Sequence, residues 1–362
     1  MIFIVLMSLM GLLGYLIMPD DTPMANNMTL QLSIKKPGST FTLLRVAKNE
    51  DVEKRSVIGK MLYGQASAYS EIPVTWYSVK GDSIQYREYI GDEEQADISA
   101  ISLYKLSGKA DSAKLAALSQ SERNLYVGKQ YIEKRTYYLG TDIYGRDLLS
   151  RLILGIRVSL SVGVMAVIIS LLIGVLAGSV AGYYGGRTDA SVSWLMNVVW
   201  SLPALLLVIA ISFALGKGFW QIFIAVGLSM WVEVARLVRG QTLALKEVEF
   251  VEASRALGFT DRRTIFNHIL PNIAGPILVV ASSNFASAIL LEAGLSFLGF
   301  GAQPPMPTWG GMIKEHYGYI IIDAAYLAIL PGLAIMLMVY AFNLVAVGLR
   351  DAFDVRSQNT NV

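Results

Sequence analysis

The sequence predicts an all-α polytopic membrane protein with about six transmembrane helices and an α+β insert between the first two helices. Three observations predict this fold class. Hydrophobic residues make up 54% of the 362 residues and charged residues only 16%, and the mean hydropathy is +0.49. Several runs also reach the roughly 20 apolar residues that a helix needs to cross a bilayer core of about 30 Å. Few charges remain to cover the surface of a soluble domain.

The predicted helices are taken in chain order. Residues 2–18 are just long enough to span, and they lack the basic lead and the A-x-A site of a signal peptide, so we expect an uncleaved helix over residues 1–19. A run over 218–232 stops at Glu233 and extends as helix through Ala235. The four other runs carry no charged residue; they are 159–184, 190–216, 269–291 and 324–349. Pro203 and Pro331 mark expected kinks within two of them.

The insert covers residues 20–138, a polar stretch without a spanning segment. Apolar and polar residues alternate at three places, which is typical of half-buried strands. Residues 80–83 form a predicted turn between the last two strands, and 111–125 has the spacing of a helix. The predicted strands are 30–35, 72–76 and 84–86.

Basic residues in short loops set the orientation. The loop at 216–218 carries one lysine, whereas the segment 236–268 is rich in arginine and lysine. With six spans, that segment and the C-terminal tail at 355–362 are both expected in the cytoplasm. The insert is then extracytoplasmic, and its many basic residues are compatible with this because long translocated domains escape the charge bias.

The cytoplasmic segment is predicted to form two helices joined at a glycine. Small and apolar residues recur at helical spacing from Val248 to Leu257. Gly258 stands where a helix end favours a residue that tolerates positive φ. Thr260 is a candidate cap for the next helix, which runs toward Pro271. Residues alone leave two interpretations open: a docking element for a partner, or a surface hairpin packed on its own protein.

Two further regions carry candidate functional residues. Gly140, Gly145 and the charges of Asp142, Arg146 and Asp147 predict a structured loop with ion pairs just outside the bilayer, rather than direct substrate contact. Residues 293–313 are uncharged but rich in proline, which predicts a re-entrant or capping loop. Glu292 is the carboxylate at the end of the fifth run; a pathway role and structural pairing are both open.

Composition and missing motifs exclude several functions. The chain has no cysteine, and its two histidines stand apart, so we expect no catalytic residues and no metal site. A net charge of +2 without an aromatic-rich basic tract excludes nucleic acid as a partner. No G-x-x-x-x-G-K-[ST] phosphate cradle occurs, so no cofactor is expected on this chain. The spans hold almost no charge, which disfavours ion-coupled secondary transport, the alternative of a different class.

Three motifs, in order, resemble one family. The stretch Glu252-Ala253-Ser254, with Gly258, Ile269 and Pro271, is similar to the cytoplasmic EAA loop of bacterial ABC importer permeases. Residues 139–160 resemble the segment before the second span in the dipeptide/oligopeptide/nickel branch, and 292–310 resembles the same branch between spans five and six. The chain is therefore identified as a member of that family and resembles its C-type subunit over residues 139–354.

The resemblance implies a type I importer permease that couples to separate ATPase subunits through a loop at 240–271. The partners implied are a second permease, two ATPase subunits carrying ATP and Mg, an extracytoplasmic binding protein, and the inner membrane. Di- and oligopeptides are the expected substrates, with nickel or another small solute as the alternative. The insert is longer than the family's usual first loop. The motif residues implicated in coupling are Glu252, Ala253, Ala256, Leu257, Gly258, Arg262 and Pro271, and those of the external loop are Gly140, Thr141, Asp142, Gly145, Arg146 and Asp147.

Overall fold

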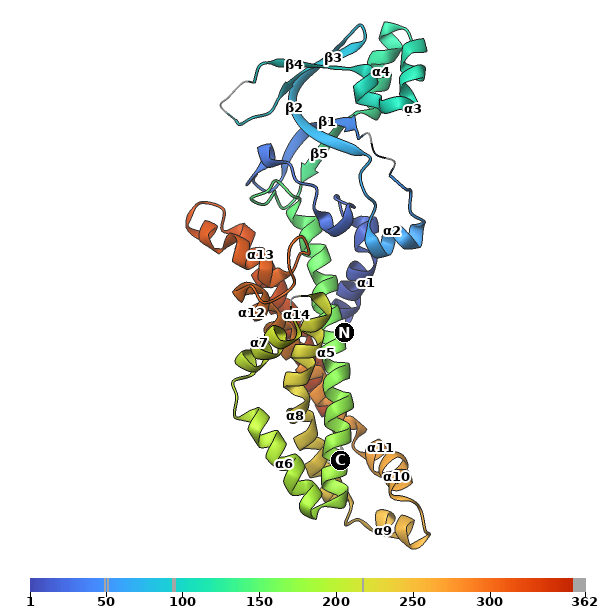
Figure 1. Ribbon diagram of the computed structural model, residues 1–362, viewed down its shortest axis with the longest axis vertical. Coiled ribbons are helices and arrows are strands. Elements are labelled where there is room, and N and C mark those ends of the chain that lie inside the picture. Colours follow the sequence, from blue (N-terminus) through green and yellow to red (C-terminus); the bar gives the residue numbers. More distant parts are fainter. Residues whose placement is uncertain (49, 51, 93–95, 217, 354–362) are drawn as a thin grey trace, which may run out of the picture. The chain divides into compact units, whose positions relative to one another are not determined.

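The computed structural model describes residues 1–48, 50, 52–92, 96–216 and 218–353 (Figure 1). The predicted tail at 355–362 lies outside these residues. The chain divides into two compact units. The helical unit comprises Met1–Ser8, Gly155–Tyr317 and Ala328–Val362, and the sheet unit comprises Leu9–Leu154 and Gly318–Leu327.

Four described helices are long and apolar enough to cross a membrane. The longest has 37 residues, about 55 Å at ~1.5 Å per residue, and it exceeds the ~30 Å of a bilayer core. The N-terminal helix α1 (Ile2–Ile17) has 16 residues and is shorter than these four. The four helices are α5 (Leu148–Tyr184), α8 (Phe219–Leu245), α12 (Ala274–Leu298) and α14 (Tyr326–Phe353).

The predicted span at 190–216 is two helices rather than one straight helix. They are α6 (Gly186–Trp200) and α7 (Ala204–Leu215), bent by 95° at the break. Pro203 stands at the N-cap of α7, and a proline disfavours helical backbone in the residue before it, which ends α6. The pair is a broken span or a re-entrant loop, and it raises the count of candidate spans from four to as many as five.

Helices α5 and α8 approach each other backbone to backbone, as Figure 1 allows the reader to follow. Gly174, Gly178 and Gly182 recur every four residues on the face of α5 that touches α8. A Cβ atom on any of the three would collide with α8. Small residues at this spacing let membrane helices pack closely. The main-chain oxygens in the way belong to Trp231, Ala235 and Arg239.

Polar contacts also join α6 to α8. The Arg239 guanidinium forms a bidentate ion pair with Asp189, with Nη2 2.6 Å from Oδ2. Three residues earlier, Arg236 donates to Asn197 at 2.9 Å and lies 4.1 Å from the centre of the Trp200 ring. These contacts fix the side of α8 against which α6 lies.

Helix α12 extends into the range 293–313, which was predicted as a re-entrant or capping loop. It ends at Leu298, and Gly299 closes it in the left-handed conformation. After the loop, α13 (Trp309–His316) packs back on α12, where a Cβ on Gly310 would collide with the main chain of Ala293. The region is therefore a helix end, a loop and a short helix.

The sheet unit is built on a five-stranded antiparallel sheet of order β4-β3-β2-β1-β5. Its core gathers apolar residues from the strands and from two helices, among them Leu44, Ile84, Leu106 and Val127. The strands are β1 (Ser39–Ala47), β2 (Tyr69–Lys80), β3 (Ser83–Glu88), β4 (Ile98–Ser102) and β5 (Ile132–Tyr137). The short α2 (Val57–Tyr63) precedes β2, and the two core helices are α3 (Leu103–Ala117) and α4 (Gln120–Gln130).

Two local predictions in this unit need correction. The predicted strands at 72–76 and 84–86 are parts of β2 and β3, but the strand predicted at 30–35 is wrong. Residues Leu30–Leu32 form a 3-10 turn, because the segment bonds to residues 141–144 instead of joining the sheet. The helix predicted at 111–125 is divided at Ser119, which caps α4 together with Glu122.

Candidate functional site

Four short helical pieces follow α8 and form the segment that the sequence predicts for docking. They are α9 (Glu249–Ala256), α10 (Asp261–Arg263), a π-helical stretch Thr264–Ile269 and α11 (Leu270–Asn272). The inner side of α9 is formed by Val251 and Ser254, both buried. The Ser254 hydroxyl bonds the Val251 carbonyl at 2.7 Å and lies 3.3 Å from the Thr264 hydroxyl. The segment is thus anchored on one face.

The turn between α9 and α10 has the geometry that its sequence predicts. Gly258 adopts φ +75°, and its N–H donates to the Arg255 carbonyl at 2.9 Å. The next amide, of Phe259, donates to the Ser254 carbonyl at 3.1 Å. These two bonds define a Schellman motif. The predicted cap is also present, since the Thr260 hydroxyl accepts from the Arg263 amide.

Much of the segment is exposed within the described part of the chain. All seven residues that the resemblance implicates in coupling are exposed there: Glu252, Ala253, Ala256, Leu257, Gly258, Arg262 and Pro271. Leu257 is 74% exposed, and the sequence reasoning missed a second apolar side chain, Phe250, which is 39% exposed. Phe250 is a large apolar residue outside the buried side of α9, and this position is the signal that could have identified it. Small residues flanked by exposed apolar ones suit a protein partner.

Tyr183 connects this segment to the end of α5 and was not predicted. Its hydroxyl donates to the Asp261 carboxylate at 2.9 Å and accepts from Arg255 Nε at 3.4 Å. The Arg255 guanidinium also lies 4.9 Å from the centre of the Tyr183 ring. The sequence gives no signal for this role, because a tyrosine near the end of an apolar run is typical of the membrane–water interface. Movement of the segment would therefore bear directly on α5.

The external-loop residues form a buried clasp in the sheet unit. Asp142 accepts from the amides of Tyr144 and Arg146, at 2.8 and 3.0 Å, and from Arg146 Nε at 2.5 Å. The Arg151 guanidinium lies 3.6 Å from the same carboxylate. Asp142 and Arg146 are 0% and 2% exposed, so the ion pairs of the predicted structured loop are buried. Removing one partner of a buried pair costs far more than breaking an exposed pair.

Backbone contacts hold the clasp against residues 29–37. Thr141 accepts from the Lys35 amide at 2.8 Å through its hydroxyl, and its own amide donates to the Lys35 carbonyl. Gly140 and Gly145 have φ of +80° and +72°, and a Cβ on either would collide with main-chain atoms of this segment. The glycines of the motif are thus explained by close backbone approach.

Asp147 completes the clasp and begins α5. Its Oδ2 accepts from the amide and the hydroxyl of Ser150, at 2.8 and 2.5 Å, in the manner of an N-cap. Burial raises the pKa of Asp147, and the two Ser150 bonds only partly offset this. Burial likewise raises the pKa of Asp20, whose amide donates to the Ser150 hydroxyl. The six motif residues therefore have structural contacts.

Glu292 is enclosed within the helical unit. Its side chain is fully buried, and Oε1 accepts from the Ser296 hydroxyl at 2.6 Å. Oε2 has no hydrogen-bond partner within the described part of the chain. Glu292 is absent from the lining of the cavity between α7, α8 and α12. A pathway role for Glu292 stays a prediction.

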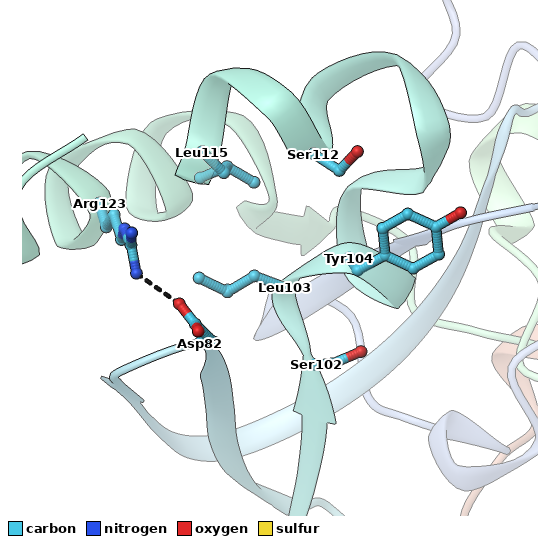
Figure 2. A pocket seen from close by; sticks show the side chains of 7 residues that line it. All are labelled: Asp82, Ser102, Leu103, Tyr104, Ser112, Leu115 and Arg123. Carbon is cyan, nitrogen blue, oxygen red and sulfur yellow. Dashed lines mark hydrogen bonds and ion pairs between the residues drawn. The ribbon is translucent and has the colours of Figure 1, made fainter. Parts of the chain in front are cut away.

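Two hollows in the sheet unit carry polar side chains that are already paired. In the first, of about 430 Å³, Arg123 points to Asp82 across the mouth and bonds it at 2.6 Å (Figure 2). The second has about 610 Å³ and is lined by several charged residues. There Arg135 forms a bidentate pair with Glu71 at 2.6 and 2.7 Å, and Lys60 pairs with Asp21 at 2.6 Å.

Comparisons with known proteins agree with this arrangement. Residues 174–359 match the family described as binding-protein-dependent transport system inner membrane component. The chain is 43% identical over 218 residues to the glutathione transport system permease protein GsiD of Pectobacterium atrosepticum, covering 60% of this chain and 72% of the relative. It is 41% identical over 218 residues to the dipeptide transport system permease protein DppC of Alkalihalophilus pseudofirmus, covering 60% and 71%.

Among solved structures, the chain matches an inward-facing form of the MetNI methionine ABC transporter. The TM-score is 0.47 at 20% identity, covering 56% of this chain and 97% of that chain.

Proposed function

This chain belongs to the family of binding-protein-dependent transport system inner membrane components, and we propose that it forms one half of the pathway of an ABC importer for di- and oligopeptides. It is a membrane-embedded permease subunit of the peptide importer branch. The peptide substrate is supported by relatives that carry the names of glutathione and dipeptide permeases at 43% and 41% identity. ATP hydrolysis then belongs to separate subunits.

In the proposed topology the chain crosses the inner membrane six times. Besides α5, α8, α12 and α14, the spans are α1 and the bent pair of α6 and α7. This count puts the arginine-rich segment after α8 in the cytoplasm, in keeping with the positive-inside rule. The sheet unit then lies outside, where an extracytoplasmic binding protein delivers the peptide. Within that unit, Asp142 pairs with Arg146 and with Arg151 in the first turn of α5.

The observation that carries the coupling role is that the segment after α8 has a buried side and exposed motif residues. The inner side of α9 is anchored by Ser254 and Val251, while each of the residues implicated in coupling is exposed. A groove on an ATPase subunit would receive α9, with Ala253 and Ala256 permitting close approach. Closure of the two ATPase subunits would push α9, and Tyr183 would pass the movement to α5 through Asp261 and Arg255. A heterodimer with a second permease would thereby switch from inward- to outward-facing.

The test of this proposal is a charge reversal on the exposed face of α9. Glu252→Arg is expected to abolish peptide-dependent uptake and to reduce co-purification of the ATPase subunits, whereas the overall fold is retained because Glu252 is exposed. The matched control is Asp351→Arg near the end of α14, which makes the same change in charge outside the segment.

Uptake is measured in vesicles with ATP, with and without vanadate. Normal uptake and normal ATPase co-purification by Glu252→Arg would refute the coupling role. ATP-independent, vanadate-insensitive uptake would refute the importer itself and favour a secondary transporter.

A further inference from the structure

A cavity of about 470 Å³ lies in the helical unit between the α6–α7 connection, α8 and α12. Its walls are mostly apolar and include Trp200, Leu202 and Met230, with the hydroxyls of Ser229 and Ser287 among them. This volume is in the range of small-molecule sites, which combine an apolar lining with few polar groups. One ionisable side chain, Glu233, lines the cavity.

Glu233 occupies an unusual position for a carboxylate. It lies near the middle of α8, about 21 Å from Phe219 and about 18 Å from Leu245 at ~1.5 Å per residue. The side chain is exposed in the isolated chain. It forms no hydrogen bond or ion pair within the part of the chain that the structure describes. An ionised group that faces lipid carries a large cost, so Glu233 is expected to face a polar space or a cation.

The nearby cations of the same helix are already engaged. Arg236, one turn away, donates to Asn197 and stacks on Trp200. Arg239 is held in the bidentate pair with Asp189. The charge of Glu233 is therefore not neutralised by α6 or by its own helix, and it is available to a cation that enters the cavity.

We propose that this cavity is a subsite of the transport pathway in which Glu233 binds the ammonium group of the substrate peptide. The inference rests on the proposed import of peptides and adds the recognition of one end of the substrate. Trp200 and the aliphatic walls accommodate the apolar parts of the peptide, while the carboxylate accepts hydrogen bonds from the ammonium group. The lining comes from both sides of the break at Pro203, so the shape of the subsite depends on the bend between α6 and α7.

The experiment uses the complete importer, both permeases with both ATPase subunits, in lipid nanodiscs without nucleotide or binding protein. Binding is measured calorimetrically for three probes: tri-alanine, N-acetyl-tri-alanine and N-acetyl-Ala-Lys-Ala. The wild type is expected to prefer tri-alanine over its acetylated form by about tenfold or more, since a charge-assisted bond is lost. If N-acetyl-Ala-Lys-Ala binds as tightly as tri-alanine, the site accepts any ammonium group. If it binds weakly, the site recognises the α-amino group of the peptide.

Glu233→Gln is expected to reduce that preference to less than about twofold, and Glu233→Asp, which keeps the charge, to retain part of it. Asp351→Asn is the matched control and is expected to keep the wild-type preference. The chain contains no cysteine, so Glu233→Cys supplies a single thiol. Its modification by a water-soluble methanethiosulfonate is expected to be slowed by tri-alanine.

The outcomes separate the subsite from the proposed function. An unchanged preference in Glu233→Gln, or a thiol at 233 that tri-alanine does not protect, would overturn the subsite while import itself stands. Loss of the second permease from the Glu233→Gln complex would overturn it in favour of an ion pair between the two permeases. A wild-type importer that neither binds these peptides nor takes them up with ATP would refute the proposed function as well.

Discussion

Gly258 offers a test in which backbone conformation can be separated from packing. The residue adopts φ +75°, and a Cβ atom built on it meets nothing within 4 Å. An alanine would therefore suffer no collision, and its cost would be that of the left-handed conformation, about 1–2 kcal/mol. Asparagine tolerates this conformation, so Gly258→Asn is expected to cost only a fraction of that.

Hydrogen exchange measures this cost locally, because it reports the free energy of opening of individual amides. The amides of Gly258 and Phe259 close the Schellman motif through Arg255 and Ser254. In Gly258→Ala, protection of these two amides is expected to fall roughly 5- to 30-fold, as about 1–2 kcal/mol requires. Gly258→Asn should change it only slightly. Equal protection in the alanine variant and the wild type, or an equal loss in alanine and asparagine, would refute the conformational explanation.

Three further predictions follow from the packing and the charges. Gly178→Ala places a Cβ that would collide with the Ala235 carbonyl, and it is expected to lower the free energy of unfolding in detergent by about 1–3 kcal/mol. Gly240→Ala is the control, because open space surrounds it, and it should stabilise α8 slightly. Equal changes in the free energy of unfolding for the two variants would contradict the helix contact. Glu71→Gln removes the bidentate partner of the Arg135 guanidinium, which is 12% exposed and keeps its second partner, Glu133, at 3.1 Å. The loss is expected to be about 1.5–3 kcal/mol, measured by thermal unfolding, whereas a loss under about 1 kcal/mol would show that the pair is not buried in solution. Because the pKa of Asp147 is raised from 3.8 in the folded protein, the folded state binds the proton more tightly, and stability from this group is lost as pH rises through the folded-state pKa. The stability of Asp147→Asn relative to the wild type is therefore expected to increase from pH 3.8 upward and then to level off; a difference independent of pH would contradict the raised pKa.

The sequence predicted those features that depend on local chemistry. Apolar runs matched to the thickness of a bilayer located α5, α8, α12 and α14, because helix length is set by rise per residue. The turn between α9 and α10 was predicted from Gly258 and Thr260, because helix ends are determined by the residues adjacent to them. Strands β2 and β3 were predicted in part by alternation around a short turn.

Features that depend on distant segments could not be predicted in the same way. Residues 30–35 alternate like a strand, but their partners are residues 141–144, more than 100 positions away, and these bonds turn the segment out of the sheet. Alternation reports which face is buried and not which backbone supplies the hydrogen bonds. Likewise, Pro203 predicted a kink, but neither the 95° bend nor the contact of α6 with α8 could be predicted from the residues around it.

For the candidate site, the sequence by itself determined which segment is the candidate for docking, since its motif and its capping chemistry are contiguous in the chain. The tertiary structure decided what that segment is attached to. Tyr183 meets Asp261 and Arg255 from positions more than 70 residues away, and Glu233 meets an open cavity only because α6, α7 and α12 converge beside it. Such contacts arise from the packing of separate helices, which no local pattern encodes.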